Sequence, residues 1–368
     1  MIADNAWVDA LARMGVITIA IPLAVLVLTY LERKVIGRLQ MRLGPMRVGP
    51  YGTLQSVADT VKLLTKEDLR PQTADRWTFE LAPFVVVVPG FLALVTIPFT
   101  SDLFVRNLGL GLFYIVAVSG LSIVGFLMAG WGSDSKYALL GGVRAAAQLI
   151  SYEIPLIMAV LAVAMVGQSL DLIELVNGQD KVPFAFWQPL AFFIFVVAGL
   201  AELYRQPFDI PVAESEVVGG PLIEYSGIRW SMFQMAEYTN LVLISVLGSL
   251  LFLGGWNWPG GNEVGAALQV VWTILKASGF ILFFMWMRGS MPRLRIDQLM
   301  AFCWQVLLPF AFLQIIINGL VLVYEWPDWT LGVLSGIAAL AAVYITYRSA
   351  RRAVVAYSPR LQQAGSVS

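Results

Sequence analysis

The stretch that decides the fold is AELYRQPFDIPVAESEVVGGPLIEYSGIRWSMFQMAEY, residues 201–238, which lies between two strongly apolar segments. It holds six carboxylates and only two arginines, Arg205 and Arg229. The carboxylates are Glu202, Asp209, Glu214, Glu216, Glu224 and Glu237. Acids near hydrocarbon are costly, so this cluster predicts a functional site. Pro207 and Pro211 bar a continuous helix, so residues 202–238 are predicted to form a cytoplasmic loop.

Two interpretations of this acidic loop stay open on the sequence alone. In the first, the acids line an aqueous funnel, where closely spaced carboxyls raise one another's pKa and can relay protons. In the second, the loop is solvated and its acids pair with basic residues of a partner protein. Both place the working part of the chain on the cytoplasmic side.

The composition is that of a polytopic membrane protein with no large soluble domain. The chain is 58% hydrophobic and 13% charged, with a mean hydropathy of +0.76, whereas soluble domains are about a quarter charged. A net charge of zero gives no sign of a nucleic-acid partner. The absence of histidine and the single cysteine, Cys303, argue against a disulfide, a metal site, haem or an iron–sulfur cluster held by this chain. No dinucleotide or flavin-binding fingerprint is visible either.

The apolar runs predict one all-α membrane domain over residues 1–368, with about nine transmembrane helices. The expected spans are 11–31, 80–99, 109–130, 146–167, 186–204, 239–256, 266–288, 302–324 and 329–348. Of the 24 Lys and Arg residues, 20 then lie on one side, three lie on the other, and Lys276 lies inside a span. The positive-inside rule therefore predicts a periplasmic N-terminus and a cytoplasmic C-terminus. We expect a multi-pass protein of a bacterial plasma (inner) membrane.

The first cytoplasmic loop, residues 32–79, contains the pattern of an amphipathic helix. From Thr53 onward, apolar residues including Leu54 and Val61 fall on one helical face, and Asp59 and Lys62 fall on others. This pattern predicts a helix that lies on the membrane surface. The alternative is a connector helix packed on other subunits.

Several charged residues lie in or next to the apolar spans. Glu153, Glu202, Glu237 and Glu32 are all expected on one side of the membrane, which favours a common polar path over separate ion pairs. Lys276 lies mid-span, where a lysine usually faces an acid or a water chain, although snorkelling to the surface is the alternative. Arg293 and Arg295 form a compact charged group after the seventh span, or simply hold that loop inside.

Four motifs, in order along nearly the whole chain, resemble the H subunit of respiratory complex I, the quinone-site membrane subunit of type-1 NADH:quinone oxidoreductases. They are LERKVIGRLQMRLGPMRVGPYGTLQSVADTVKLLTKED (31–68), GWGSDSKYALLGGVRAAAQLISYE (130–153), the acidic stretch that opens this section, and RLRIDQL (293–299).

The resemblance implies a subunit that admits quinone from the bilayer and couples its reduction to proton translocation. Its implied partners are the other membrane subunits and the hydrophilic-arm subunits that carry the terminal iron–sulfur cluster. The implied quinone is ubiquinone, menaquinone or plastoquinone, a substrate rather than a resident group. The residues that match the family at the quinone path are Arg33, Leu54, Asp59, Phe208, Phe233, Arg293 and Arg295. Those that match the proton path are Glu153, Glu202, Asp209, Glu214, Glu216, Glu224, Glu237 and Lys276.

The chain departs from the family pattern at three positions. Val212 stands where the family usually has Glu, Gly120 stands where many members carry a Glu, and Met46 stands where Asn is common. The first two changes remove carboxylates from the implied proton path and leave the quinone motifs intact. A ferredoxin-linked branch and a scaffold subunit of a membrane-bound hydrogenase-type complex are therefore alternatives. A free-standing secondary transporter is another, although its usual internal repeat is not visible.

Overall fold

The computed structural model describes residues 2–101, 103–179, 182–257 and 265–365, and every regular element in these ranges is helical. Lys181, one of the three positive charges expected on the outer side, lies outside the described residues. The predicted all-α membrane fold is confirmed.

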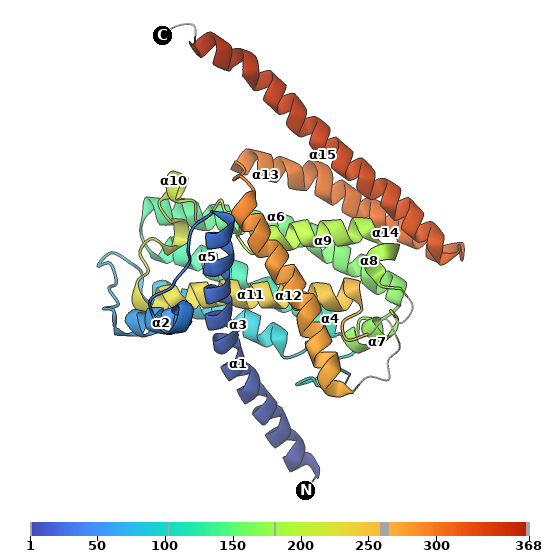
Figure 1. Ribbon diagram of the computed structural model, residues 1–368, viewed down its shortest axis with the longest axis horizontal. Coiled ribbons are helices and arrows are strands. Elements are labelled where there is room, and N and C mark those ends of the chain that lie inside the picture. The colour runs from blue at the N-terminus through green and yellow to red at the C-terminus, as the bar shows by residue number, and fades with distance from the viewer. Residues whose placement is uncertain (1, 102, 180–181, 258–264, 366–368) are drawn as a thin grey trace.

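Eight helices or helix pairs in the described ranges are long and apolar enough to cross a membrane. Figure 1 shows most of them packed side by side in one body, with α1 and α15 projecting from it at opposite ends. The eight are α1 (Ile2–Leu39), α3 (Arg76–Leu94), α4 with α5 (Gly111–Ser119 and Leu121–Gly132), α6 (Lys136–Gly167), α11 (Gly227–Leu253), α12 (Ala266–Ser290), α13 with α14 (Ile296–Phe302 and Leu308–Val323, joined by a π-helical turn at Cys303–Leu307) and α15 (Asp328–Gly365).

The fifth expected span is the short one. It consists of α8 (Phe184–Trp187) and the 14-residue α9 (Pro189–Glu202). At about 1.5 Å per residue α9 is about 21 Å long, less than the ~30 Å thickness of a bilayer core. The break falls at Gln188, because Pro189 lacks the N–H that a continuous helix needs. The hydroxyl of Ser335 on α15 accepts the N–H of Leu190 at 3.1 Å, so the helix start is satisfied inside the protein.

Several helices begin earlier than the apolar runs predict, among them α3, α6 and α11. α3 starts at Arg76, α6 at Lys136 and α11 at Gly227, whereas hydropathy predicts starts at 80, 146 and 239. The extra turns carry charged residues, including Arg76, Lys136 and Arg229, which lower their mean hydropathy, so hydropathy alone does not detect them. The expectation that Glu153 lies near a helix start and Glu237 just before one is therefore wrong, because both lie inside helices.

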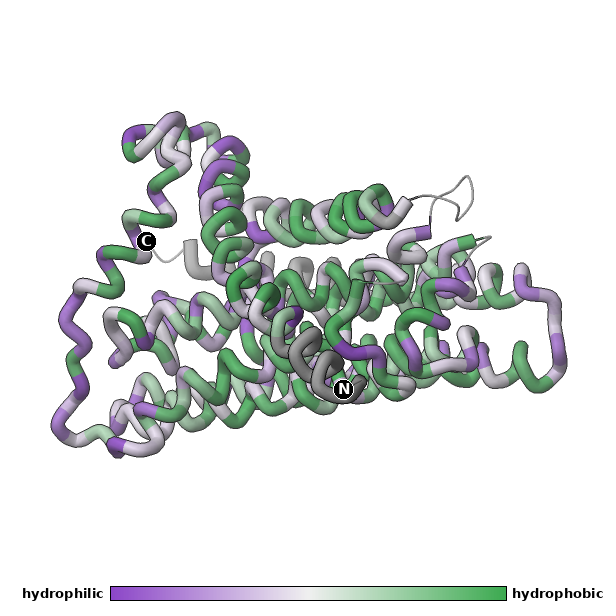
Figure 2. Tube along the Cα trace, turned by 90° about the horizontal axis from the view of Figure 1, so that it is seen from below, coloured by the Kyte–Doolittle hydropathy of each residue, from purple (hydrophilic) through white to green (hydrophobic). Residues whose placement is uncertain are grey.

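α11 is the central helix, and its neighbours are α3, α12, α1, α2 and α9. Most of its apolar stretch is buried, whereas α1 is mainly exposed. Figure 2 shows the hydrophilic residues gathered in the loops at the ends of the bundle and the hydrophobic residues along the helices. The first turns of α11 reach the loop end, where they become part of the site described below.

The predicted amphipathic helix is α2 (Gln55–Thr65), which follows a turn at Pro50–Gly52. Its apolar residues point away from the protein: Val57, Val61 and Leu64 are all exposed. Its polar side, which carries Asp59, faces α1. An exposed apolar face suits both a membrane surface and a neighbouring subunit. The remaining short elements are α7 (Leu172–Asn177), α10 (Glu214–Val217) and a turn at Gly220–Leu222.

Candidate functional site

The acidic stretch folds over a cavity of about 1210 Å³ that is also lined by residues of α5, α6, α9, α11 and α12. Four of the six predicted carboxylates line it, namely Glu202, Asp209, Glu214 and Glu237. Arg288, Arg293 and Val212 also line it. The structure thus brings four of the six acids together around one space, and their part in proton transfer stays a prediction.

One wall of this cavity is aromatic. The ring of Phe233 lies 4.9 Å from that of Tyr225 and 5.9 Å from that of Phe126. Tyr225 stacks on Phe79 at 4.2 Å, and its hydroxyl donates to the backbone oxygen of Phe79 at 3.1 Å. Burial raises the pKa of Tyr225 above its ordinary value, so this hydroxyl stays protonated. The cavity therefore has an apolar side beside its charged one.

α6 holds the acidic loop in place. The side-chain amide of Gln148 donates to the backbone oxygens of Ala201 and Phe208, both at 2.8 Å. Gly220 has a positive φ of 59°, and a Cβ there would lie 1.8 Å from the oxygen of Pro211. Only glycine fits that turn, which brings the loop back against α6.

A buried network of charges joins the loop to α1, α11 and α12. Arg205, whose side chain is fully buried, donates from Nη1 to Glu32 Oε2 at 2.6 Å, and its Nε lies 3.2 Å from Glu237 Oε1. Arg288 pairs with the other oxygen of Glu32 and lies 3.9 Å from Glu237. Burial lowers the pKa of Arg205, but the carboxylates of Glu237 and Glu32 raise it by more, so the guanidinium stays charged.

A second cavity of about 490 Å³ adjoins the first. Its walls come from α1, the loop at residues 42–45, α2, α11 and α12, and include Arg33, Ile36 and Gln55. Gln234, Glu237 and Arg288 line both cavities. These three side chains therefore form a shared wall between a space beside α1 and the acidic cavity.

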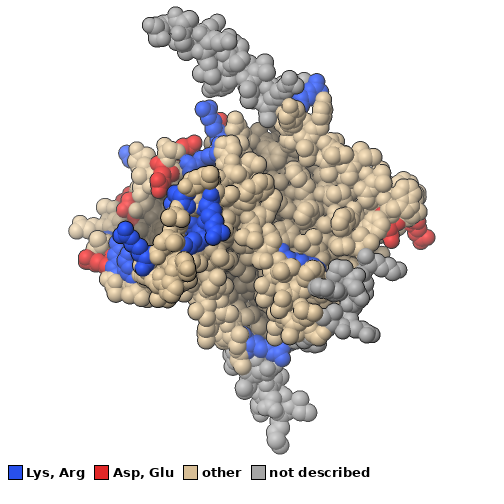
Figure 3. Space-filling model, viewed as in Figure 1, with Lys and Arg blue, Asp and Glu red and all other residues tan. Residues whose placement is uncertain are grey.

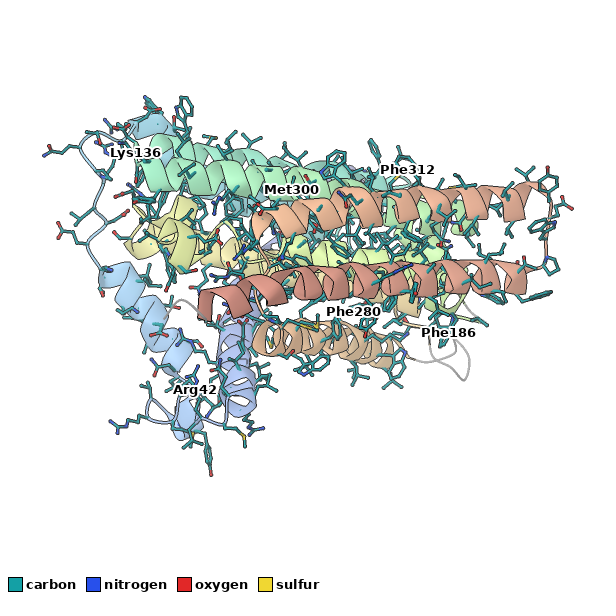
Figure 4. All side chains as sticks on the ribbon, turned by 90° about the horizontal axis from the view of Figure 1, so that it is seen from above. Arg42, Lys136, Phe186, Phe280, Met300 and Phe312 are labelled. Atoms are coloured by element: carbon teal, nitrogen blue, oxygen red, sulfur yellow. The ribbon has the colours of Figure 1, made fainter. Side chains whose placement is uncertain are left out.

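Arg33 and Asp59 form an ion pair of 2.5 Å at the mouth of the second cavity, so two of the predicted quinone-path residues contact each other. Arg42 lies in the same region, and in Figure 4 it is at the same end of the bundle as Lys136, with Phe186 at the other end. Figure 3 shows Lys and Arg gathered near α1 and α2, while much of the remaining visible face is uncharged. The site therefore lies at the basic end of the molecule.

Arg293 holds the acidic loop from the other side. Its Nη2 lies 3.0 Å from Asp209 Oδ2, and its Nη1 donates to Ser215 Oγ at 3.1 Å. Burial raises the pKa of Asp209, and the neighbouring Arg293 lowers it by less, so the pKa stays above its ordinary value. The Asp209 carboxyl is thus easier to protonate than an exposed one.

The other predicted site residues lie outside both cavities. Phe208 is buried in the core, with its ring 5.6 Å from that of Tyr152, and Leu54 is exposed at the start of α2. Arg295 precedes α13 and is exposed. Glu216 pairs with Arg144 at 2.7 Å on the outer side of the loop, and Glu224 lines neither cavity. Glu153 lies deeper in α6, close enough to Glu202 for their charges to interact.

Lys276 is far from the acids. Its Nζ donates to the backbone oxygens of Leu253, Gly255 and Asn257, at 2.7, 2.8 and 3.1 Å. These oxygens lie at or just beyond the C-terminal end of α11, where a cation is favourable. Glu237 lies about sixteen residues earlier on that helix, about 24 Å away along its axis. The contacts seen are those of a helix cap, and its role in a proton path stays a prediction.

Sequence reasoning missed the most buried charge of the site. In the sequence, Arg205 is only one of two positive charges in an acidic loop, and Arg288 is only a topology signal. Their signal is position: each lies at the end of an apolar span, and Arg205 also lies within the acidic stretch. Gln148 and Gln234 give no signal, because each is an isolated uncharged residue inside a helix.

Comparison with known proteins agrees with this architecture. Residues 12–319 match a family model described as NADH dehydrogenase. The chain is similar to the H subunit of the NADH-quinone oxidoreductase of Brevibacillus brevis, with 47% identity over 296 residues, 80% of this chain and 88% of the relative. It is similar to the H 2 subunit of the Rhizobium meliloti enzyme, with 45% identity over 329 residues, 85% of this chain and 99% of the relative. The H subunit of Dehalococcoides mccartyi strain CBDB1 is 42% identical over 331 residues, 90% of this chain and 92% of the relative.

The fold and the site together define an all-helical, multi-pass membrane protein with a charged cavity at one end of its bundle. The chain belongs to the family of NADH-quinone oxidoreductase H subunits, whose members are membrane subunits of an enzyme complex.

Proposed function

We propose that this chain forms the membrane part of a quinone-binding site and carries the carboxylates that couple quinone reduction to proton translocation. The observation that supports this most directly is the shared wall of Gln234, Glu237 and Arg288. A charge change in the space beside Arg33 would act on the same side chains that border the acidic cavity.

The second cavity suits the entry of a quinone. It lies beside α1, whose surface is mainly apolar and exposed, and it is lined by Ile36 and Leu43 together with Arg33. Most of its lining is polar or charged, which suits the polar head group of a quinone better than its apolar tail. Arg33 and Gln55 supply hydrogen-bond donors for carbonyl oxygens. Phe233 and Arg293 would then border the further part of the path, in the first cavity.

Reduction of a quinone to a quinol takes up two electrons and two protons. In this proposal the electrons come from an iron–sulfur cluster in a hydrophilic-arm subunit, and this chain holds no redox centre. The positive charges of Arg33 and Arg288 stabilise negative charge that develops on the quinone oxygens. As Arg288 is drawn toward that charge, its hold on Glu32 and Glu237 weakens, and Glu237 takes up a proton more readily.

The four cavity carboxylates provide the next positions for protons. Glu237 borders both cavities, Glu202 lies further in, and Glu153 is within electrostatic range of Glu202. The order from Glu237 to Glu202 to Glu153 leads from the quinone space into the membrane. We propose a bacterial plasma membrane with the N-terminus periplasmic, which places both cavities on the cytoplasmic side.

The test is photo-crosslinking of the intact native complex with a quinone-analogue probe, followed by mapping of labelled peptides. We expect label within residues 31–68 or 202–237 that excess quinone competes away. Label elsewhere, or label that is not competed in a complex that still passes electrons to a soluble acceptor, would reject the quinone role. That outcome would favour a scaffold subunit of a hydrogenase-type complex.

A further inference from the structure

Two polar side chains of the second cavity lack a hydrogen-bond partner. They are Gln234 and Tyr238, which both line the cavity from α11. Among the residues that the structure describes, no hydrogen bond joins the Gln234 amide or the Tyr238 hydroxyl to another group of the chain. A polar group inside a protein is costly unless a ligand or a water molecule contacts it.

The other polar side chains that line this cavity have partners. Its carboxylates and two of its arginines form the ion pairs described above. The remaining ones, Thr29, Arg42 and Gln55, each donate a hydrogen bond within the chain, at 2.7, 2.7 and 3.3 Å. In the described part of the chain, the lining side chains without a partner are therefore both on α11.

The two side chains lie close together and one of them is held firmly. Gln234 and Tyr238 are four residues apart, so they lie on the same face of α11, about 6 Å apart along its axis. The guanidinium of Arg205 lies 5.0 Å from the centre of the Tyr238 ring, and Arg205 is itself fixed by Glu32 and Glu237. Tyr238 is only 4% exposed, yet its hydroxyl oxygen is not sealed in the core. The ring is therefore fixed in place while the residue borders the open space of the cavity.

These two groups differ from the arginines of the cavity in what they bind. A guanidinium only donates hydrogen bonds, whereas a side-chain amide and a hydroxyl both donate and accept them. A quinone presents carbonyl oxygens, which accept, and a quinol presents hydroxyls, which also donate. Gln234 and Tyr238 therefore suit the substrate and its reduced product alike, which arginines alone do not.

We propose that Gln234 and Tyr238 are positioning residues that hold the quinone head group against α11 in the second cavity. The Gln234 amide and the Tyr238 hydroxyl donate to carbonyl oxygens of the quinone and accept from the hydroxyls of the quinol. This contact places the head group beside Glu237 and Arg288, which line the same cavity. The inference rests on the proposed quinone function and adds to it the place where the head group binds.

The first test records the carbonyl bands of an isotopically labelled short-chain quinone bound to the intact complex, by isotope-edited infrared spectroscopy. A hydrogen bond lowers the stretching frequency of a carbonyl group, so Tyr238→Phe and Gln234→Leu should each move a carbonyl band to higher frequency. Tyr30→Phe and Gln72→Leu are the matched controls and should leave the bands in place, because Tyr30 and Gln72 line neither cavity. Unchanged bands in both test variants would overturn the proposal, and a shift in only one would overturn the paired site.

The second test separates quinone binding from structural support. Loss of one hydrogen bond to the head group should raise the KM for a short-chain quinone by up to about tenfold in each test variant, with little change in kcat. Thermal unfolding should stay unchanged, because neither group bonds to another described part of the chain. Lower thermal stability with an unchanged KM would overturn the proposal.

Photo-crosslinking of the unaltered complex distinguishes failure of this inference from failure of the quinone function. Label within residues 31–68 or 202–237 that excess quinone competes away, combined with unchanged KM and carbonyl bands in both test variants, would reject these positioning residues and leave the quinone function standing. Absence of competed label in the unaltered complex would reject both.

Discussion

Arg205 Nη1 lies 2.6 Å from Glu32 Oε2, across 173 residues of sequence, and this ion pair fastens the acidic loop to α1. Both side chains are almost fully shielded from solvent, and Glu237 and Arg288 complete the group. Removal of one member of such a buried group leaves the others uncompensated, which is far more costly than loss of a surface pair.

Arg205→Met should therefore destabilise the protein by roughly 3–5 kcal/mol, because Glu32 loses its closest buried cation. Thermal unfolding of the purified complex and the yield of assembled complex on native gels would measure this. Arg70→Met is the matched control, since Arg70 pairs with Glu80 at the surface at 3.1 Å and such pairs contribute about 0–1 kcal/mol. Equal effects of the two variants would show that the buried network does not hold the loop.

Glu202→Gln should block proton translocation while the complex still assembles. Glu202 lines the same cavity as Glu237 and lies within electrostatic range of Glu153. The glutamine amide that replaces its carboxyl cannot take up and release a proton. Proton uptake by vesicles during quinone reduction would be compared with that of Glu325→Gln, an exposed acid outside both cavities. Normal pumping in the Glu202 variant would remove this residue from the path.

Asp209 should change protonation at a higher pH than an exposed aspartate, because burial raises its pKa more than Arg293 lowers it. The Asp209–Arg293 pair is complete above that pKa and is lost as the pH falls through it. A carbodiimide that reacts with protonated carboxyls, followed by peptide mapping, would give the midpoint. Arg293→Gln removes the influence that lowers the pKa, so the midpoint should move further upward. A downward move would contradict the lowering effect assigned to Arg293.

Lys276→Met tests whether this lysine is a cap or a proton carrier. Its three bonds to the end of α11 predict lower thermal stability, by about 1–3 kcal/mol, with proton translocation per quinone reduced unchanged. Lys276→Arg should recover part of the stability because the charge remains. Abolished pumping in Lys276→Met, in a complex of normal stability, would instead support the proton-path assignment.

The sequence predicts the overall fold well because hydropathy and charge asymmetry are properties of single segments. It places the starts of α6 and α11 about ten residues too late, because charged residues such as Lys136, Arg144 and Arg229 interrupt the apolar pattern of their first turns. Residues 186–204 look like an ordinary span, and only Pro189, with the polar groups around Gln188, reveals the break.

The site was predictable to the extent that its members lie in one stretch. Glu202, Asp209, Glu214 and Glu237 are close in sequence and meet in one cavity, whereas Glu216 and Glu224 from the same stretch point elsewhere. A loop that turns back on itself at Gly219 and Gly220 divides its acids between an inner and an outer side. Contacts such as that of Arg205 with Glu32 depend on the packing of α1 against α11, which no local pattern encodes.

The wall of Gln234, Glu237 and Arg288 has a geometric consequence. Two of these residues lie on one turn of α11, so a small rotation of that turn would enlarge one space at the expense of the other. A molecule bound in the second cavity, beside α1, would then change the volume of the acidic cavity by displacing this turn. No chain of hydrogen bonds between the two cavities would be needed. A bulky inhibitor and a charge on the quinone would therefore both act through the same turn of α11.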